Sequence, residues 1–249
     1  MNVSLYQAAS ALNAMDRWQE TIAENLASSS VPGYKKQDFS FAAVQAGLHP
    51  VAGSSAGSRA VLMSGGQAGT NFQPGDFRVT NVKTDVAVDG KGFFEVQLPN
   101  GSSAYTRDGE FHIDAQGQLV TKEGYRVMGD GGPIILDLNN YTELSISATG
   151  EVSQGADLKG RLKLTEFGNT KALTRLSGGY FTAENPATAA MASDASSVRQ
   201  GVLEQANTST VMEMANLMTA MRTFEANQRM AQIHDDRMAK TITELGNLS

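Results

Sequence analysis

The side chains that most often carry catalysis or bind metals are few in this sequence, and they lie far apart. The 249 residues include no cysteine and three histidines, His49, His112 and His234. No second histidine stands at helical spacing from any of them, so the usual ligand set of a zinc site is missing, and a cysteine nucleophile is excluded. Neither a Walker motif nor a G-x-S-x-G motif is present. We therefore expect no catalytic residue, no metal, no cofactor and no enzymatic activity.

Carboxylates gather at Asp108, Glu110 and Asp114, but their spacing does not fit a calcium-binding loop, which also ends in a glutamate. Aspartates in turns usually accept hydrogen bonds from their own backbone, and we expect that role here. The motif Gly90-Lys91-Gly92 lacks the third glycine of a dinucleotide-binding fingerprint and precedes a predicted strand, so we interpret it as a turn. The sequence leaves open a pair of carboxylates for glycoside hydrolysis.

Charge and hydropathy exclude several classes of partner. The net charge is −6, and the 20 basic and 26 acidic side chains are interspersed rather than gathered into a basic face, which predicts no binding to nucleic acid. A membrane span needs about 20 consecutive apolar residues. The sequence contains no such run, so we expect no membrane insertion. Residues 1–14 contain neither a basic residue nor a long apolar core, so any export is expected to proceed without a cleaved signal peptide.

Two amphipathic helices are predicted, one near each end of the sequence. Residues 3–28 place apolar side chains alternately three and four positions apart, and this helix is predicted to stop at Val31-Pro32-Gly33, because the residue before a proline avoids the helical region. Residues 210–245 show the same spacing. They begin with the capping-box pattern Thr210-Val211-Met212-Glu213 and end before Gly246, where a helix cap is expected.

The apolar seams of these helices have no third helix to share them, which predicts that they pack on each other and on neighbouring molecules. Six of the 11 methionines lie between Met212 and Met238. Methionine is flexible and fills irregular gaps, so these residues indicate either a helix core or a surface that packs against non-identical neighbours. The seam residues taken as a candidate assembly interface are Leu5, Leu12, Met15, Ile22, Leu26, Met214, Leu217, Met221, Phe224, Met238, Ile242 and Leu245.

The middle of the sequence is predicted to be β structure. Turn pairs such as Asp108-Gly109 and Glu123-Gly124 separate short runs with alternating apolar side chains, which is typical of an antiparallel sandwich or barrel. The predicted fold class is α+β, with long N- and C-terminal helices forming a coiled-coil-like layer and a central all-β domain. The expected domains are an N-terminal helix and turn (1–44), a Gly/Ala/Ser-rich linker (45–75), the central β domain (76–200) and a C-terminal helix (201–249).

Three blocks of the sequence resemble the flagellar basal-body rod and hook family of bacteria. The first contains Ala23-Glu24-Asn25-Leu26-Ala27-Ser28 followed by Gly33-Tyr34-Lys35, with Glu24 and Ser28 where the family often has asparagine. The second is Asp89-Gly90-Lys91-Gly92-Phe93-Phe94, continued by Tyr105-Thr106-Arg107-Asp108-Gly109. The third is Leu203-Glu204-Gln205-Ala206-Asn207 with Arg222-Thr223-Phe224-Glu225. The proximal-rod type is the closest resemblance, and the distal-rod type comes second.

The resemblance implies a structural subunit of the rod, which polymerises through its terminal helices and transmits motor torque to the hook. It implies as partners other copies of the chain, neighbouring rod proteins and the flagellar type III export apparatus. The implied location is the basal body, in the part of the rod that crosses the periplasm. It adds Asn25, Gly33 and Tyr34 to the candidate assembly interface.

Two other readings compete with this one. A carbohydrate-binding or hydrolytic β domain carried on a coiled-coil oligomer would keep its activity without the terminal helices. A secreted adhesin fibre would lack the Gly33-Tyr34-Lys35 and Asp89–Phe94 blocks.

Overall fold

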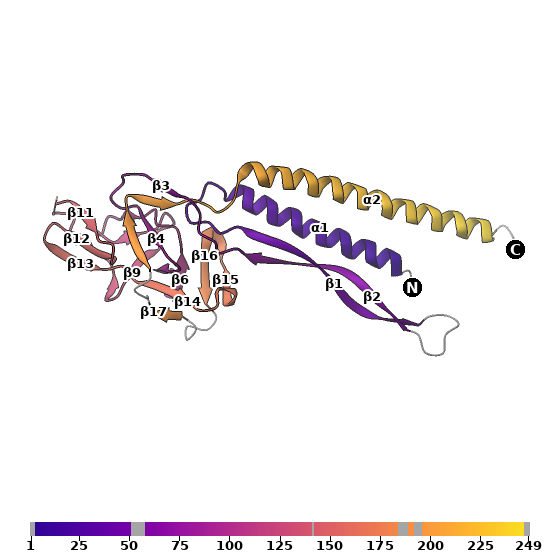
Figure 1. The fold of residues 1–249 in the computed structure, drawn as a ribbon, viewed down its shortest axis with the longest axis horizontal. Coiled ribbons are helices and arrows are strands. Elements are labelled where there is room, and N and C mark those ends of the chain that lie inside the picture. Colours follow the sequence, from indigo (N-terminus) through magenta and orange to yellow (C-terminus); the bar gives the residue numbers. More distant parts are fainter. Residues whose placement is uncertain (1–2, 51–57, 141, 184–188, 192–195, 247–249) are drawn as a thin grey trace. The chain divides into compact units, whose positions relative to one another are not determined.

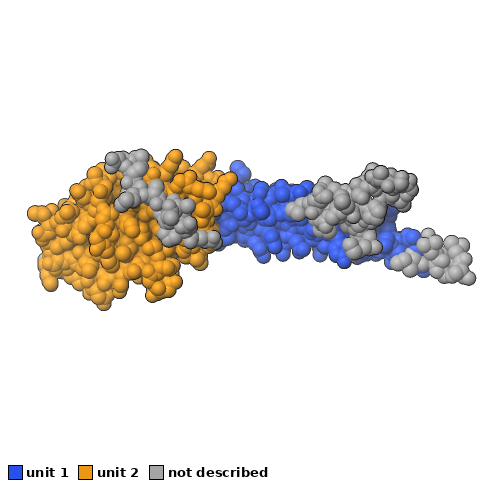
Figure 2. Space-filling view, turned by 90° about the horizontal axis from the view of Figure 1, so that it is seen from below, with its two compact units in different colours: residues 1–27, 37–70, 209–249 blue, residues 28–36, 71–208 orange. Residues whose placement is uncertain are grey.

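The structure is a computed structural model that describes residues 3–50, 58–140, 142–183, 189–191 and 196–246 (Figure 1). Backbone contacts divide the chain into two compact units (Figure 2). The terminal unit contains residues 1–27, 37–70 and 209–249, and the β unit contains residues 28–36 and 71–208. Each unit therefore combines stretches that are far apart in the sequence.

The terminal unit consists of helix α1 (Val3–Ala27), the strands β1 (Gln37–Pro50) and β2 (Ser58–Thr70), and helix α2 (Thr210–Gly246). The strands form an antiparallel hairpin, and α1 lies between this hairpin and α2 (Figure 1). The two helices run in opposite directions. Ile22 of α1 and Ala220 of α2 are buried. The Gln19 side chain Nε2 also donates a hydrogen bond to the Ala220 carbonyl oxygen at 3.4 Å, which ties the two helices together.

The predicted coiled-coil-like layer is wrong, although the α+β class with a central β domain agrees with the structure. The described part of the chain contains two α-helices, and a hairpin covers the second side of α1. A strict heptad seam also drifts by about 20° per heptad around a straight helix, so it does not stay on one face. Accordingly Ala220 is buried against α1, whereas the seam residues Met214 and Met221 are 50% and 51% exposed.

The Gly/Ala/Ser-rich segment expected to be a linker is largely the β1–β2 hairpin. Composition misled the prediction because small residues also allow close packing. Phe39 pairs with Ala68 in the register, and its ring covers the neighbouring Gly66: a Cβ atom at Gly66 would lie 2.1 Å from the Phe39 ring. Phe39 in turn packs edge-to-face on Phe41, with ring centroids 5.0 Å apart. Glycine at position 66 therefore makes room for an aromatic side chain.

The described residues of the β unit form 17 short strands and two turns of 3-10 helix, and the strands make up one ten-stranded antiparallel sheet and several smaller ones. The strands are β3 (Phe77–Val79), β4 (Val86–Asp89), β5 (Phe93–Gln97), β6 (Ser103–Thr106), β7 (His112–Ile113), β8 (Leu119–Val120), β9 (Arg126–Gly129), β10 (Gly132–Pro133), β11 (Leu144–Ile146), β12 (Glu151–Gln154), β13 (Asp157–Arg161), β14 (Leu164–Phe167), β15 (Leu173–Arg175), β16 (Tyr180–Ala183), β17 (Ala189–Met191), β18 (Ser197–Gln200) and β19 (Val202–Glu204), with η1 (Thr170–Ala172) and η2 (Ser177–Gly179).

The sheets of the β unit connect distant parts of the chain. The largest follows the order β15-β16-β6-β5-β9-β8-β7, with β10 on β9, β14 on β5 and β17 on β14. A three-stranded sheet has the order β11-β12-β13. Near the end of the unit, β18 pairs with β4 and β19 pairs with β3, so residues 197–204 close sheets that residues 77–89 begin.

The core of the β unit has two clusters, one on each side of β5. Successive side chains of a strand point to opposite faces, and here both faces are buried. Phe94 belongs to the larger cluster, with Phe111 and Leu119 among its members. Phe93 belongs to a smaller aromatic cluster, where it packs edge-to-face on Phe167 at 5.7 Å between ring centroids. The adjacent pair Phe93-Phe94 thus connects the two clusters through one strand.

Candidate functional site

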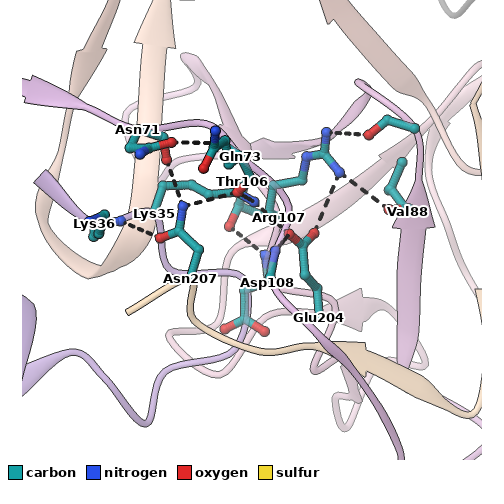
Figure 3. Close-up of polar contacts among 12 residues, drawn as sticks. Lys35, Lys36, Asn71, Gln73, Val88, Thr106, Arg107, Asp108, Glu204 and Asn207 are labelled. Carbon is teal, nitrogen blue, oxygen red and sulfur yellow. Dashed lines mark hydrogen bonds and ion pairs between the residues drawn. The ribbon is translucent and has the colours of Figure 1, made fainter. Parts of the chain in front are cut away.

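Three charged side chains meet in the interior of the β unit (Figure 3). The Lys35 Nζ lies 2.5 Å from Oε1 of Glu204, and Nη1 of Arg107 lies 3.4 Å from the other oxygen, Oε2. The side chains of Lys35, Glu204 and Arg107 are only 1%, 0% and 5% exposed. Burial lowers the pKa of both basic side chains, and the Glu204 carboxylate opposes this by favouring their charged forms.

Backbone groups supply further hydrogen bonds to these charges, although the buried Nε of Arg107 has no hydrogen-bond partner among the described residues. Lys35 Nζ donates to the Gln73 carbonyl oxygen at 2.9 Å, and Arg107 Nη2 donates to the Gly90 carbonyl oxygen at 2.7 Å. Glu204 Oε1 also accepts a hydrogen bond from the Gly75 N–H at 2.9 Å. Buried ions are tolerated only when they are paired and hydrogen-bonded in this way. The three side chains therefore form a structural centre of the β unit.

Asn207 extends this centre through its side-chain amide (Figure 3). Its Oδ1 accepts a hydrogen bond from the Lys36 N–H at 2.7 Å, and its Nδ2 donates to the carbonyl oxygens of Asn71 and Gln73 at 2.8 and 2.9 Å. Lys35, Arg107, Glu204 and Asn207 together are called the polar cluster below. The cluster joins the segment that follows α1 in sequence to the segment that precedes α2.

Gly33 lies against the polar cluster at a position that only glycine fits. Its φ of +66° is in the left-handed region, and a Cβ atom there would lie 2.2 Å from the Arg107 carbonyl carbon. The Gly33 N–H donates to the Glu204 carbonyl oxygen at 2.7 Å. The next residue, Tyr34, is buried beneath the Arg175 guanidinium, which lies 4.4 Å from the ring centroid.

A similar amide contact orders the terminal unit. Asn25, near the end of α1, accepts a hydrogen bond from the Gln37 N–H and donates one to the Gln37 carbonyl oxygen, both at 2.8 Å. The side chain thereby imitates a strand partner for the first residue of β1. Asn25 and Asn207 each bind backbone groups of a segment next to a helix end. Both side chains therefore have a structural role within their own unit.

Most of the large apolar side chains that are exposed in the described part of the terminal unit lie on α2. We define the methionine surface as Met212, Met214, Met218, Met221, Met230 and Met238, which are 46–60% exposed. Met214, Met218 and Met221 are spaced by four and three residues, so they follow one another along the helix. Beyond Ala231, every α2 side chain that the structure describes is exposed.

The predicted interface residues divide into three groups. Nine are buried or half-buried within the chain: Leu12, Met15, Ile22, Asn25, Leu26, Gly33, Tyr34, Leu217 and Phe224. Three are exposed on α2: Met214, Met221 and Met238. Leu5, Ile242 and Leu245 belong to the helices, but their side chains lie outside the described part. The structure thus brings the first group into internal packing and leaves the second group available.

The other residues considered for chemistry lie apart. His112 and His234 are exposed in β7 and α2, while the His49 side chain is outside the described residues. The predicted turn role of the aspartates is confirmed, because Oδ1 of Asp114 accepts hydrogen bonds from the N–H groups of Gln116 and Gln118. Among the described residues, no group of three or more acidic or histidine side chains could hold a metal ion. In the same residues, no helix is long and apolar enough to span a membrane.

Asp108 is a buried carboxyl group whose Oδ1 accepts a hydrogen bond from the Glu110 N–H at 2.9 Å. Burial, together with the nearby carboxylates of Glu110 and Glu123, raises the pKa of Asp108 to about 7. The unfolded chain releases this proton near pH 4, whereas the folded chain keeps it until about pH 7. The native state binds more protons across that interval, so this group makes the free energy of unfolding fall as the pH rises from about 4 to 7.

Replacing Asp108 with asparagine is expected to remove this contribution, because the amide keeps an acceptor oxygen for Glu110 and carries no proton to lose. The variant should be more stable than the wild type at pH 8 by about 2–4 kcal/mol, and the difference should shrink towards pH 4. Urea unfolding of both proteins at several pH values measures it. A difference that does not change with pH would contradict the assignment.

Three family descriptions match the chain. "Flagella basal body rod protein" matches residues 5–35, "Flagellar hook protein FlgE/F/G D1 domain" matches residues 87–154, and "Flagellar basal body rod FlgEFG protein C-terminal" matches residues 199–244. Lys35, Arg107 and Glu204 each fall in a different one of these regions. The polar cluster therefore draws its three charges from all three matched segments.

Whole-length relatives carry rod-protein names. The chain is 32% identical to the flagellar basal-body rod protein FlgG of Borreliella burgdorferi, over 94% of this chain and 96% of the relative. It is 31% identical to FlgG of Buchnera aphidicola from Acyrthosiphon pisum, over 95% of this chain and 97% of the relative. It is also 31% identical to the flagellar basal-body rod protein FlgF of Escherichia coli, over 96% and 97%.

Proposed function

We propose that this chain, which belongs to the flagellar basal-body rod protein family, joins its neighbours in the rod through the exposed surface of α2. As a member of that family it is a structural subunit of the basal body and assembles with other rod components. The carbohydrate-binding and adhesin alternatives are set aside, because rod proteins match the chain over almost its whole length. Relatives named FlgG and FlgF match with nearly equal identity, so the proximal or distal position stays a prediction.

The methionine surface is the observation that carries the proposed mode of assembly. Within the terminal unit, α1 is covered on one side by α2 and on another by the hairpin, whereas α2 keeps six half-exposed methionines. Apolar side chains clustered at a surface are typical of a site for another protein, and Met214, Met218 and Met221 form such a cluster along one side of the helix. Methionine adapts its shape to different partners, which suits a subunit whose neighbours are not all identical.

Such an interface also suits a shaft. A surface that binds a different patch on the next molecule gives an open, head-to-tail assembly rather than a closed dimer. Close packing between helices is nearly incompressible, so it can transmit torque with little loss. In this proposal the polar cluster stiffens the β unit itself, because it ties the segment around Lys35 to the segment around Glu204 and Asn207.

Replacing Met214 and Met221 together with aspartate is expected to reduce incorporation into basal bodies at least tenfold, because each buried, unpaired carboxylate is strongly unfavourable in an apolar contact. Both side chains are about half exposed in the subunit, so its fold should persist. Immunoblotting of purified basal bodies measures incorporation, and circular dichroism checks the fold.

The matched control is Leu158→Asp, an exposed apolar residue of β13 that is 66% exposed. It should incorporate like the wild type. Normal incorporation of the methionine double variant would disprove the proposed interface. Equal loss in the Leu158 variant would show that the effect does not belong to α2.

The family also supports the finer location predicted above. In this proposal the subunit lies in the part of the rod that crosses the periplasm, and the flagellar type III apparatus exports it without removing a signal peptide. The mass of the subunit isolated from basal bodies tests the second part, because loss of N-terminal residues other than the initiator methionine would contradict it.

A further inference from the structure

We infer that the methionine surface of α2 is an oxidation site in the free subunit, and that its oxidation by hydrogen peroxide prevents entry into the rod. The inference rests on the proposed function, because it assigns a form of regulation to the same surface. It is carried by the exposure and chemistry of the six side chains and by the clustering of Met214, Met218 and Met221 on one side of the helix.

Methionine dominates the exposed apolar side chains of α2. The large apolar side chains that are exposed on this helix, within the described residues, are the six of the methionine surface together with Val211 and Ile233. Leucine has a similar volume and good helix propensity, so it would cover the same area. Methionine differs from leucine in carrying a thioether that reacts with peroxide. Two other methionines, Met15 of α1 and Met128 of β9, are half-buried and provide an internal comparison.

The reaction transfers one oxygen atom from the peroxide to the side chain. A lone pair on the thioether sulfur attacks one oxygen of hydrogen peroxide, the O–O bond breaks, and water leaves after a proton transfer. The methionine is oxidised to the sulfoxide, and the peroxide is reduced to water. Solvent access to the sulfur controls the rate, so the half-exposed residues of α2 should react before Met15 and Met128.

The product is incompatible with an apolar interface. A sulfoxide oxygen accepts hydrogen bonds, and burying it without a donor is unfavourable. Met214, Met218 and Met221 follow one another along one stretch of the helix, so oxidation of any one places a polar group within the same contact. After assembly the neighbouring subunit would cover the sulfur atoms. Sensitivity to peroxide is therefore confined to the subunit before it enters the rod.

The first measurement is peptide mapping of the purified, full-length subunit during treatment with dilute hydrogen peroxide. Sulfoxide should form at Met214, Met218 and Met221 at least fivefold faster than at Met15 and Met128. Equal rates at both sets would overturn the inference, because the surface would not be a preferred site. The same mapping on subunits already in basal bodies should show the α2 methionines protected.

The second measurement is co-sedimentation of the subunit with basal bodies from cells that lack it. The untreated protein should bind, the oxidised protein should lose at least nine-tenths of that binding, and reduction by the two methionine sulfoxide reductases should restore it. Binding by the oxidised protein at the untreated level would overturn the inference and leave the proposed function intact. Failure of the untreated protein to bind would instead contradict the proposed function.

A variant separates sulfur chemistry from general damage. Met214→Leu, Met218→Leu and Met221→Leu together remove three sulfur atoms and keep the apolar volume, so the binding that this protein retains to basal bodies should not change on peroxide treatment. The matched control carries Met15→Leu and Met128→Leu and should remain sensitive. If the leucine variant binds and is still inactivated by peroxide, the α2 sulfurs are not responsible. If the leucine variant does not bind at all, the deciding measurement is whether the two methionine sulfoxide reductases restore binding to the oxidised wild-type protein.

Discussion

Glu204→Gln is expected to lower the free energy of unfolding by about 3–5 kcal/mol, the cost of breaking a buried ion pair. The substitution leaves the ammonium of Lys35 and the guanidinium of Arg107 buried, and the other hydrogen-bond partners described for them carry no negative charge. The amide N–H₂ group of the new glutamine would also face either the Lys35 ammonium or the Arg107 guanidinium. Both of these groups are hydrogen-bond donors, so the contact would be repulsive. Urea unfolding at pH 7, followed by circular dichroism, measures the loss.

An exposed ion pair of the same chain supplies the control. The Lys83 Nζ lies 2.6 Å from Glu143 Oε1, but the two side chains are 59% and 72% exposed. Water already solvates both charges there, so Glu143→Gln should leave the free energy of unfolding almost unchanged. Similar losses in the Glu204 and Glu143 variants would show that burial of the polar cluster contributes nothing.

Gly33→Ala is expected to be strongly destabilising, because it combines a left-handed backbone conformation with overlap of backbone atoms. A left-handed conformation costs a non-glycine residue about 1–2 kcal/mol. At Gly33 the new Cβ would also overlap backbone atoms of Arg107 and Asp108, at 2.2 and 2.4 Å, so the strand connection must move. We expect a total loss of about 4 kcal/mol or more, and reduced incorporation into basal bodies, because the displaced backbone carries the polar cluster.

Gly101→Ala separates the two causes. Gly101 also has a positive φ, of +83°, but no atom lies within 4 Å of the position its Cβ would take. This variant should lose only the conformational term of about 1–2 kcal/mol. Thermal or urea unfolding of both variants gives the comparison, and equal losses would show that the overlap at Gly33 is relieved without cost.

The sequence predicted the elements whose signals are local. The helix boundaries near residues 3 and 27 and near residues 210 and 246 follow from apolar spacing, a proline and a capping box. The turn around Gly90-Lys91-Gly92 follows from glycine content, and it connects β4 to β5 as expected. These features depend on a few neighbouring residues, so one sequence is enough to find them.

The features that were missed depend on distant residues. Lys35 and Glu204 look like ordinary surface charges in the sequence, and only the fold places them 2.5 Å apart. The β1–β2 hairpin was missed because its glycines read as a linker, whereas Gly66 makes room for a ring from the other strand. A signal for the polar cluster did exist: Lys35, Arg107 and Glu204 each occur in a block that resembles the rod family, but their shared location could not be read from spacing.

The late position of Glu204 has a consequence for the order of events during synthesis. Lys35 and Arg107 are made early, but their carboxylate partner follows them by 169 and 97 residues. The strands that complete the pairing of β3 and β4 lie at residues 197–204 as well. A ribosome must therefore translate as far as Glu204 before the central domain can close. Until then the nascent polypeptide stays open, and a chaperone has time to bind it.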